Sequence, residues 1–365
     1  MQFAATPGHA PATSPIAAST PVRSAPAQGT DEVPASVQMY ELLYSSLASQ
    51  LVIVVAEIGV ADHLVAGPRS VDDLARSTET DAGALYRMLR ALASIGVFTE
   101  VSYRTFGLTP LAATLRSDVD TSMRDLARYV GLRERQQALA ALTHSARTGK
   151  PAFDHVHGRD WWSHFEAHPE LTELFNRAMG SMARQVNSAT IEAYDLSEVR
   201  HLVDVGGGQG QLVTTVLRRY LDMTAVVFDL PHVAAQAEDV VRRAGLAERV
   251  ECVGGDFLDA VPAGGDAYVL SWTLHDWDDP AAVQILLNIR AVMADGGRLI
   301  VIDEVIPEGD EPHFGKFEDI VMLALLTGRV RTAREFASVF EAAGLRITEI
   351  IETPSPTSVI VAVAA

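Results

Sequence analysis

Hydrophobic patterning divides the chain into two unlike halves, and the first half is mainly helical in period. Apolar residues recur at helical spacing, and two extended runs joined by a short polar turn follow them. Helix, turn, helix and hairpin together predict a winged-helix pattern within a helical N-terminal region. The predicted elements are helices over Val71–Ser77, Ala82–Ile95, 121–147 and Trp161–Tyr194, and extended runs over Val97–Val101 and Arg104–Thr109.

From Arg200 the pattern changes to short β-branched runs separated by helices. Alternation of this kind predicts a mostly parallel sheet covered on both faces by helices. The last two runs are joined by a Pro-containing loop, which predicts a closing antiparallel hairpin. The predicted strands are His201–Val205, Ala225–Phe228, Val250–Val253, Ala267–Ser271, Arg298–Ile302, Arg346–Glu352 and Ser358–Val363.

Three regions follow from this pattern. Residues 1–34 are rich in Ala, Pro, Ser and Thr and predict a disordered tail. A helical, winged-helix-like unit is expected over 35–190 and an α/β unit over 191–365. The stretch from Val37 to Val65 is apolar on more than one side, so it needs burial either in its own domain or against a partner subunit.

Composition narrows the function. The net charge of −18 opposes a nucleic-acid partner, because phosphate backbones are bound by clustered Lys and Arg. A single cysteine, Cys252, allows no internal disulfide and suits the reducing cytoplasm. No run reads as a signal peptide or reaches the length of a membrane span, so no membrane partner is expected.

The first strand of the α/β unit leads into the segment DVGGGQG, Asp204 to Gly210. Ligands bind at the carboxyl ends of such strands. The dinucleotide fingerprint G-x-G-x-x-G fails here, because its third glycine would fall on Gln211. An acid followed by alternating glycines, Gly206, Gly208 and Gly210, suits an ammonium group close to the backbone, as S-adenosylmethionine provides.

Acids also follow the next two strands. Asp229 closes the second strand, where a carboxylate accepts hydrogen bonds from ribose hydroxyls. Asp256 and Phe257 follow the third strand and suit the amino group and ring face of an adenine. Each signal is weak alone, but their order along the sheet predicts a nucleoside site.

These motifs resemble the S-adenosylmethionine-dependent O-methyltransferases of the plant caffeic-acid type and their bacterial secondary-metabolite branch. The resemblance covers residues 37–365, and it implies a Rossmann-like class I methyltransferase domain with a seven-stranded sheet, preceded by a helical dimerisation domain. It also implies a homodimer through the N-terminal helices, no metal, and a small aromatic acceptor that is phenolic or polyketide-like. The most specific segments are DVGGGQG at 204–210, FDLPHV at 228–233, GGDF at 254–257, LHDWDD at 274–279 and GRVRTAREF at 328–336.

By position, the resemblance implies two sets of contacts. Ser271 stands where the plant enzymes have a cofactor-contacting Lys. The implied cofactor residues are Asp204, Gly206, Gly208, Gly210, Asp229, Leu230, Asp256, Phe257, Ser271 and Trp277. The implied acceptor-pocket residues are Phe165, Asn176, Met179, Asp276, Met322 and Leu326.

His275 matches the general base of the family. A phenol ionises near pKa about 10, so an imidazole that takes its proton assists attack on the methyl group. The orienting acid at the end of the fifth strand, Glu in the family, is Asp303 here, and the second orienting Glu is Val330. Relatives with altered catalytic residues have acquired other reactions, so hydroxylation stays open beside O-methylation, as does N-methylation.

Three further interpretations compete with a methyltransferase. The first is a metal site, suggested by four histidines within residues 155–168: His155, His157, His164 and His168. No carboxylate or cysteine is spaced to complete the ligand set, so we favour histidines that are exposed to solvent. An NAD-dependent oxidoreductase lacks the fingerprint glycine. A winged-helix regulator that senses a small molecule is the third interpretation. The acids of the predicted helix–turn–helix speak against it, namely Asp72, Asp73, Glu79 and Asp81.

Overall fold

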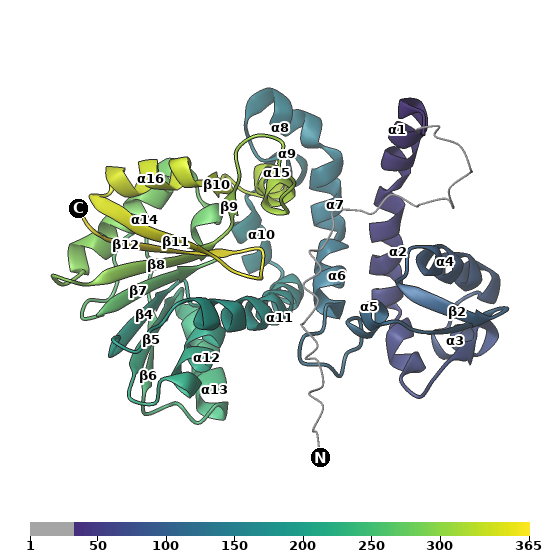
Figure 1. The fold of residues 1–365 in the computed structure, drawn as a ribbon, viewed down its shortest axis with the longest axis horizontal. Helices are drawn as coiled ribbons and strands as arrows, with labels where there is room; N and C mark the ends of the chain where they lie inside the picture. The colour runs from purple at the N-terminus through teal and green to yellow at the C-terminus, as the bar shows by residue number, and fades with distance from the viewer. Residues whose placement is uncertain (1–32) are drawn as a thin grey trace, which may run out of the picture.

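A computed structural model of the chain describes residues 33–365, without the side chains at positions 184, 185 and 188. The predicted disordered tail, 1–34, lies outside the described residues except for its last two positions. Figure 1 shows a sheet-containing unit at one end, a small helical unit at the other, and further helices between them.

The chain begins with two consecutive helices, α1 (Ala35–Tyr44) and α2 (Ser46–Glu57), which stand along the small unit (Figure 1). Their apolar side chains are largely exposed, with Leu43 at 70% and Leu47 at 54%. Ala35–Glu57 spans 23 residues at a mean hydropathy of 1.4, long and apolar enough to cross a bilayer by length and composition. The expectation that no run reaches that length is therefore wrong, because only two charged residues, Glu41 and Glu57, interrupt this otherwise uncharged stretch.

The predicted helix–turn–helix and hairpin form as the sequence indicates. Ser70 and Asp81 cap the two helices by accepting hydrogen bonds from the backbone N–H groups of Asp73 and Ala84. A two-residue strand that the pattern did not reveal completes a three-stranded antiparallel sheet. The elements are η1 (Val60–Leu64), β1 (Arg69–Ser70), α3 (Val71–Ser77), α4 (Ala82–Ser94), β2 (Phe98–Ser102) and β3 (Thr105–Leu108).

Seven helices connect the small unit to the large sheet. The last is long, and the domain boundary predicted after residue 190 falls inside it. Its first half packs among aromatic side chains, whereas Val186 and Ile191 near its end pack against the sheet. The helices are α5 (Pro110–Ala113), α6 (Arg124–Val130), α7 (Arg133–Ala140), α8 (Leu142–Thr148), α9 (Ala152–His157), α10 (Trp161–Glu166) and α11 (Pro169–Ala193).

The large sheet has seven strands in the order β11-β12-β8-β7-β4-β5-β6. The five strands from β8 to β6 are parallel, and β12 and β11 close the sheet as an antiparallel hairpin, as predicted. The strands are β4 (His201–Val205), β5 (Thr224–Asp229), β6 (Val250–Gly254), β7 (Ala267–Ser271), β8 (Arg298–Asp303), β11 (Leu345–Glu352) and β12 (Ser358–Ala364).

Helices cover both faces of this sheet (Figure 1). The end of α11 packs with α12 and α13 on one face, and α14 and α16 pack on the other. Strand β4 lies between β5 and β7, so the connections leave it in opposite directions, and a crevice opens at such a switch point. The helices are α12 (Gln211–Arg219), α13 (Pro231–Arg243), α14 (Asp279–Val292) and α16 (Ala333–Ala342).

A short parallel pair that the sequence did not predict connects the end of β8 to the GRVRT segment. Val305 pairs with Arg331 and Ile306 with Thr332. This pairing brings the loop before α16 beside the carboxyl edge of the sheet. The elements involved are η2 (Leu274–Asp276), β9 (Val305–Ile306), α15 (Gly315–Leu325) and β10 (Arg331–Thr332).

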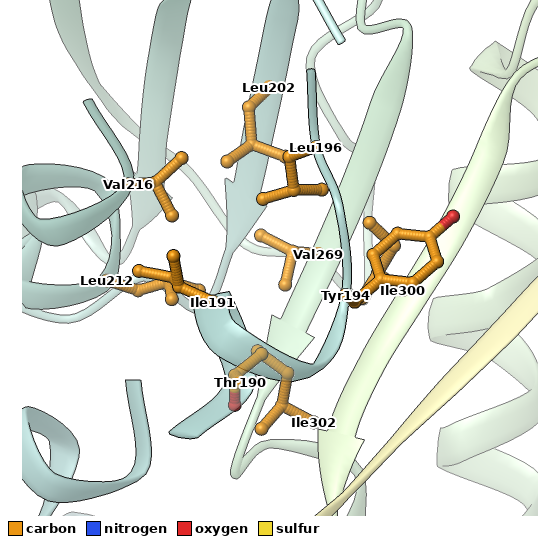
Figure 2. A pocket seen from close by; sticks show the side chains of 10 residues that line it. All are labelled: Thr190, Ile191, Tyr194, Leu196, Leu202, Leu212, Val216, Val269, Ile300 and Ile302. Atoms are coloured by element: carbon orange, nitrogen blue, oxygen red, sulfur yellow. The ribbon is translucent and has the colours of Figure 1, made fainter. Parts of the chain in front are cut away.

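Figure 2 shows a small cavity of about 20 Å³ between the end of α11, α12 and the sheet. Its lining is apolar, with Leu212, Val269 and Ile300 among the side chains that surround it. This volume is about that of one water molecule. The two hydroxyl groups of the lining already have hydrogen-bond partners: Thr190 donates to the Val186 carbonyl oxygen, and Tyr194 accepts from Arg298. We regard it as a packing gap of the core and look for the site elsewhere.

Candidate active site

The glycine loop after β4 is built for close approach of a ligand to the backbone. Gly206, Gly208 and Gly210 have φ angles of 73°, 55° and 78°, in the left-handed region that glycine adopts without strain. A Cβ on Gly206 would lie 3.0 Å from Thr273 Oγ1, whereas a Cβ on Gly208 would meet nothing within 4 Å. The loop therefore leaves open space above Gly208 at the switch point of the sheet.

Asp204, on β4 below this loop, is a buried acid without a partner. Its side chain is 1% exposed, and neither carboxylate oxygen accepts a hydrogen bond from the described residues. Burial, with the neighbouring Asp229, raises the pKa of Asp204 to about 8. A buried acid of this kind is stabilised by a cation, so Asp204 fits the ammonium group of S-adenosylmethionine.

Asp229 is the last residue of β5, and backbone N–H groups near the glycine loop orient its carboxylate. Its Oδ2 accepts from the Gly208 N–H at 2.9 Å and its Oδ1 from the Leu230 N–H at 2.7 Å. Burial raises its pKa, and these two backbone hydrogen bonds oppose that rise. Each oxygen keeps a further lone pair for a ribose hydroxyl.

The remaining predicted cofactor residues lie along the same carboxyl edge. Asp256 is exposed, and its Oδ1 accepts from the Leu258 N–H at 2.8 Å. Phe257 meets Trp277 edge to face, with ring centroids 5.6 Å apart. Leu230 is 46% exposed after β5, and Ser271 ends β7. The edge thus presents two acids and two rings around a Gly-lined opening, which suits a nucleoside.

His275 is held by Asp303 beside this edge. Its Nδ1–H donates to Asp303 Oδ1 at 2.7 Å, and the same oxygen accepts from the Glu304 N–H at 2.9 Å. His275 is 7% exposed and Asp303 is fully buried. The bond at Nδ1 fixes the ring and leaves Nε2 for other partners. As predicted, the acid at the end of β8 thus contacts the imidazole.

Two further acids surround the imidazole. Asp276 Oδ1 lies 3.5 Å from His275 Nε2. Glu304 is 1% exposed, and neither of its carboxylate oxygens has a hydrogen-bond partner among the described residues. Sequence reasoning did not single out Glu304, although it adjoins Asp303 in the chain.

The imidazole and the acids around it change one another's pKa values. Burial lowers the pKa of His275, but Asp303, Asp276 and Glu304 raise it more strongly, to about 10. Burial raises the pKa of Asp276 to about 6 and that of Glu304 to about 8, and the imidazolium opposes both shifts. The acids around His275 therefore favour its imidazolium form, which is the form that a general base adopts once it has accepted a proton.

The loop that carries His275 is fixed by Arg331, which is fully buried. Its guanidinium donates to the carbonyl oxygens of Leu274 and Trp277, each at 2.9 Å, and to Asp279 Oδ1. Gly328 packs so closely on this loop that a Cβ there would overlap the carbonyl oxygen of His275. Residues of the GRVRT segment thus hold the backbone of the loop that carries the imidazole.

An apolar cluster lies beyond this loop and gathers most of the predicted acceptor residues. Phe165, Met322 and Leu326 are buried in it, and Met179 packs against it. Asn176 is placed differently: its Nδ2 donates to Gln236 on α13 at 3.3 Å. It lines a polar cleft of about 520 Å³ that also reaches Gln209 of the glycine loop.

Val330 belongs to this apolar cluster as well, and it is 2% exposed. The position where the plant enzymes have a second acid therefore contributes apolar packing in this chain. Its backbone N–H donates to Asp319 Oδ1 at 2.9 Å.

Aromatic rings that the sequence analysis did not assign complete the wall. Tyr129 meets Trp161 and Phe175 edge to face, at centroid distances of 6.2 and 5.5 Å. Burial raises the pKa of Tyr129 to about 12, with Arg135 opposing the rise. Trp272, between β7 and His275, has a positive φ of 53° and its ring edge contacts the imidazole. Strain of this kind concentrates at functional sites.

The histidines of α8 to α11 form stacked pairs. His144 and His155 stack with centroids 4.1 Å apart, and His164 and His168 at 4.3 Å. Among the described residues no group of three His, Cys, Asp or Glu side chains is arranged to hold a metal ion.

Known proteins are similar to this chain over most of its length. The family model for the O-methyltransferase domain matches residues 139–346, and that for the O-methyltransferase dimerisation domain matches 40–118. A phenazine O-methyltransferase of Lysobacter antibioticus is 40% identical over 328 residues, 90% of this chain and 96% of that protein. Aclacinomycin 10-hydroxylase of Streptomyces purpurascens is 33% identical over 299 residues, 80% of each chain.

A solved structure is also similar to this one. An O-methyltransferase from neocarzinostatin biosynthesis, in complex with S-adenosylmethionine and 2-hydroxy-5-methyl naphthoic acid, has a TM-score of 0.74 and 32% identity. The match covers 87% of this chain and 96% of that one.

Proposed function

This chain belongs to the O-methyltransferase family, and we propose that it transfers the methyl group of S-adenosylmethionine to a hydroxyl of a small aromatic acceptor, with His275 as the base. The observation that carries the proposal is the His275–Asp303 pair at 2.7 Å. It lies between the cofactor edge of the sheet and an aromatic cluster.

The cofactor residues form one continuous surface in this proposal. Asp204 faces the ammonium group, Asp229 accepts from the ribose hydroxyls, and Asp256 and Phe257 receive the adenine. Leu230, Ser271 and Trp277 border the same surface. When bound there, S-adenosylmethionine supplies a methyl group activated by the positive charge on sulfur.

His275 moves the acceptor proton. The hydroxyl oxygen bonds to the methyl carbon, the carbon–sulfur bond breaks, and the hydroxyl proton is held at Nε2. With a His275 pKa of about 10, proton exchange with a phenol of pKa about 10 is nearly balanced. The reacting pair is therefore an imidazolium beside a phenolate, and Asp303 stabilises its positive partner.

The acceptor is held by the apolar cluster. Phe165, Met179, Met322 and Leu326 provide a flexible apolar lining that suits a flat ring, and Asp276 lies beside the reacting nitrogen. Relatives named for phenazine and naphthoic acid substrates support an aromatic acceptor. We place Asn176 at the cleft that leads to the site.

We further propose a homodimer through α1 and α2, with 35–190 as the dimerising and acceptor-capping part and 191–365 as the catalytic part. The match of residues 40–118 to a dimerisation domain supports it, as do the exposed Leu43 and Leu47. Charged replacements at these two leucines are expected to give monomers in sedimentation at micromolar concentration. A wild-type monomer under the same conditions would reject the interface. The free Cys252 suits a cytoplasmic enzyme.

A panel of hydroxylated and aminated aromatics with methyl-labelled S-adenosylmethionine tests the reaction. We expect label in the product on oxygen, located by mass spectrometry and NMR. Label on nitrogen would change the acceptor class. Addition of an oxygen atom without label would favour hydroxylation, which the buried Val330 and the similarity to a hydroxylase keep as the second candidate.

A further inference from the structure

Arg135, on α7, is a buried cation that the proposed chemistry does not use. It is 7% exposed, and its Nε–H is buried without a hydrogen-bond partner among the described residues. Its guanidinium lies over the ring of Tyr129, 5.0 Å from the centroid. Arginine is seldom this buried unless it is paired, because removing a charge from water is costly.

Three other arginines of the helical region are paired with acids. Arg124 is paired with Asp62, Arg128 with Glu57 and Arg177 with Glu173. Within residues 33–365 no ion pair includes Arg135. Contact with an aromatic face offsets only part of the cost of burying a guanidinium. Among the described residues, then, no carboxylate lies within ion-pair distance of Arg135, although Glu318 and Asp276 both act on the neighbouring Tyr129.

The position of Arg135 ties it to the acceptor pocket. Tyr129, which it covers, belongs to the same apolar cluster as Phe165, Met322 and Leu326. Helix α7 also packs against α15, which carries Met322. An anion at Arg135 would thus be part of a molecule held by this aromatic wall.

We propose that Arg135 binds a carboxylate on the acceptor, so that the preferred substrates are hydroxylated aromatic carboxylic acids. The inference rests on the proposed function, because it takes the apolar cluster as the acceptor pocket. A guanidinium matches a carboxylate in shape, and the free Nε–H is one of the two donors of a paired contact.

The charges around His275 determine how a bound acceptor is oriented. Asp276 lies 3.5 Å from His275 Nε2, and Glu304 is a second unpartnered acid near the imidazole. Asp276 would repel a substrate carboxylate placed beside the imidazole. The acceptor therefore turns its carboxylate to Arg135 and its hydroxyl to His275, and methylation falls on a hydroxyl remote from the carboxylate.

Binding to the enzyme saturated with S-adenosylhomocysteine tests the proposal without requiring turnover. The probes are 4-hydroxybenzoic acid and 6-hydroxy-2-naphthoic acid, each compared with its methyl ester, which keeps the shape and removes the charge. Calorimetry should show at least one acid binding roughly tenfold or more tightly than its ester, as expected for a charge-assisted contact. Arg135→Met should bring that ratio to about one while ester affinity stays unchanged.

Two variants separate binding from structure. Arg133→Met changes an exposed arginine on the same helix and should keep the wild-type ratio. Arg135→Lys keeps a positive charge but lacks the paired N–H donors of a guanidinium, so it should retain part of the preference for the acid over the ester. If Arg135→Met also loses ester binding, the lysine variant decides: a retained acid preference supports the proposal, and its loss overturns it.

Equal affinity for acids and esters, an acid preference that survives Arg135→Met, or no binding of either acid would also overturn the carboxylate assignment. The proposed function fails by a different readout, the absence of labelled methyl in any acceptor. The two failures are therefore distinguishable.

Discussion

The cofactor side and the acceptor side of the site are built in different ways. The cofactor side comes from consecutive strand ends between Asp204 and Trp277, and much of its geometry is backbone, as in the Gly208 N–H that donates to Asp229. The acceptor side is assembled from side chains as distant in sequence as Tyr129 and Val330. Backbone geometry constrains sequence tightly, whereas a side-chain wall can change while the fold stays the same.

The two sides also differ in charge. On the cofactor side, Asp204 is a single unpartnered acid suited to one cation. On the acceptor side, Asp303 and Asp276 raise the pKa of His275, and the imidazolium opposes the rise in the pKa values of Asp276 and Glu304. A substitution at His275 or Asp303 therefore alters the protonation of neighbouring groups. Substitutions on the cofactor side should therefore change affinity, and those on the acceptor side should change rate and its pH dependence.

The largest expected effect is that of His275→Ala. Removing a positioned base should lower methyl transfer by roughly 10²–10⁴-fold, while affinity for S-adenosylmethionine stays nearly intact. The defect should shrink as the pKa of the acceptor falls, because an acidic hydroxyl is already ionised when it binds. Turnover numbers across a series of substituted phenols measure this, alongside calorimetry of cofactor binding.

Asp303→Asn is the companion variant. It removes the charge that stabilises a proton on His275, so the His275 pKa should fall and the loss of activity on the acid side, where the imidazole is already protonated, should move to lower pH. A defect of the same size for every acceptor would assign His275 to substrate positioning, and full turnover in His275→Ala would refute the base assignment.

Asp229→Ala should have a smaller effect, and on binding. It removes charge-assisted hydrogen bonds to the ribose hydroxyls, each worth roughly 1.5–3 kcal/mol, so cofactor affinity should fall tenfold or more. Turnover at saturating cofactor should change less than affinity does. Calorimetry on the exposed Asp222→Ala serves as the control, and unchanged binding in Asp229→Ala would remove this acid from the site.

The sequence predicted the cofactor side closely. Strands β4 and β7 begin and end where the pattern placed them, because alternating strands and helices have few other arrangements. The order of Asp204, Asp229 and Asp256 along the chain was enough to place them on one edge, since parallel strands share their carboxyl ends.

The acceptor side was predicted only in part. Matching positions to the family motifs grouped Phe165, Met322 and Asn176 in one acceptor pocket. The structure places Phe165 and Met322 in the apolar cluster, whereas Asn176, on α11, contacts Gln236. Arg135 and Glu304 gave no signal, because charged residues are common in sequences and only the fold shows that these two are buried without partners. The short β9–β10 pair was missed because two residues carry no periodicity.

Glu304→Gln should stabilise the protein while altering catalysis. The buried carboxyl has a pKa of about 8, against 4.5 for the ordinary group, so between these values unfolding releases a proton and stability falls as pH rises. The amide removes that cost, and the free energy of unfolding at pH 7 should rise by about 1–3 kcal/mol. Denaturant titrations from pH 5 to 8 should show a flatter pH dependence in the variant; a destabilised variant with unchanged slope would contradict the assignment.

The smallest expected effect is a proton count on the cofactor side. With a pKa of about 8, Asp204 is mostly protonated at pH 7, and an ammonium group beside it should force it to ionise. Binding of S-adenosylmethionine should then release close to one proton at pH 7, and the release should disappear toward pH 9, where Asp204 is already ionised. Calorimetry in buffers of different ionisation enthalpy measures the number directly. Asp204→Asn should abolish the release, whereas Glu304→Gln, on the acceptor side, should leave it unchanged. If both variants changed it equally, the two sides would share one proton network, and the separation between a side that sets affinity and a side that sets rate would not hold.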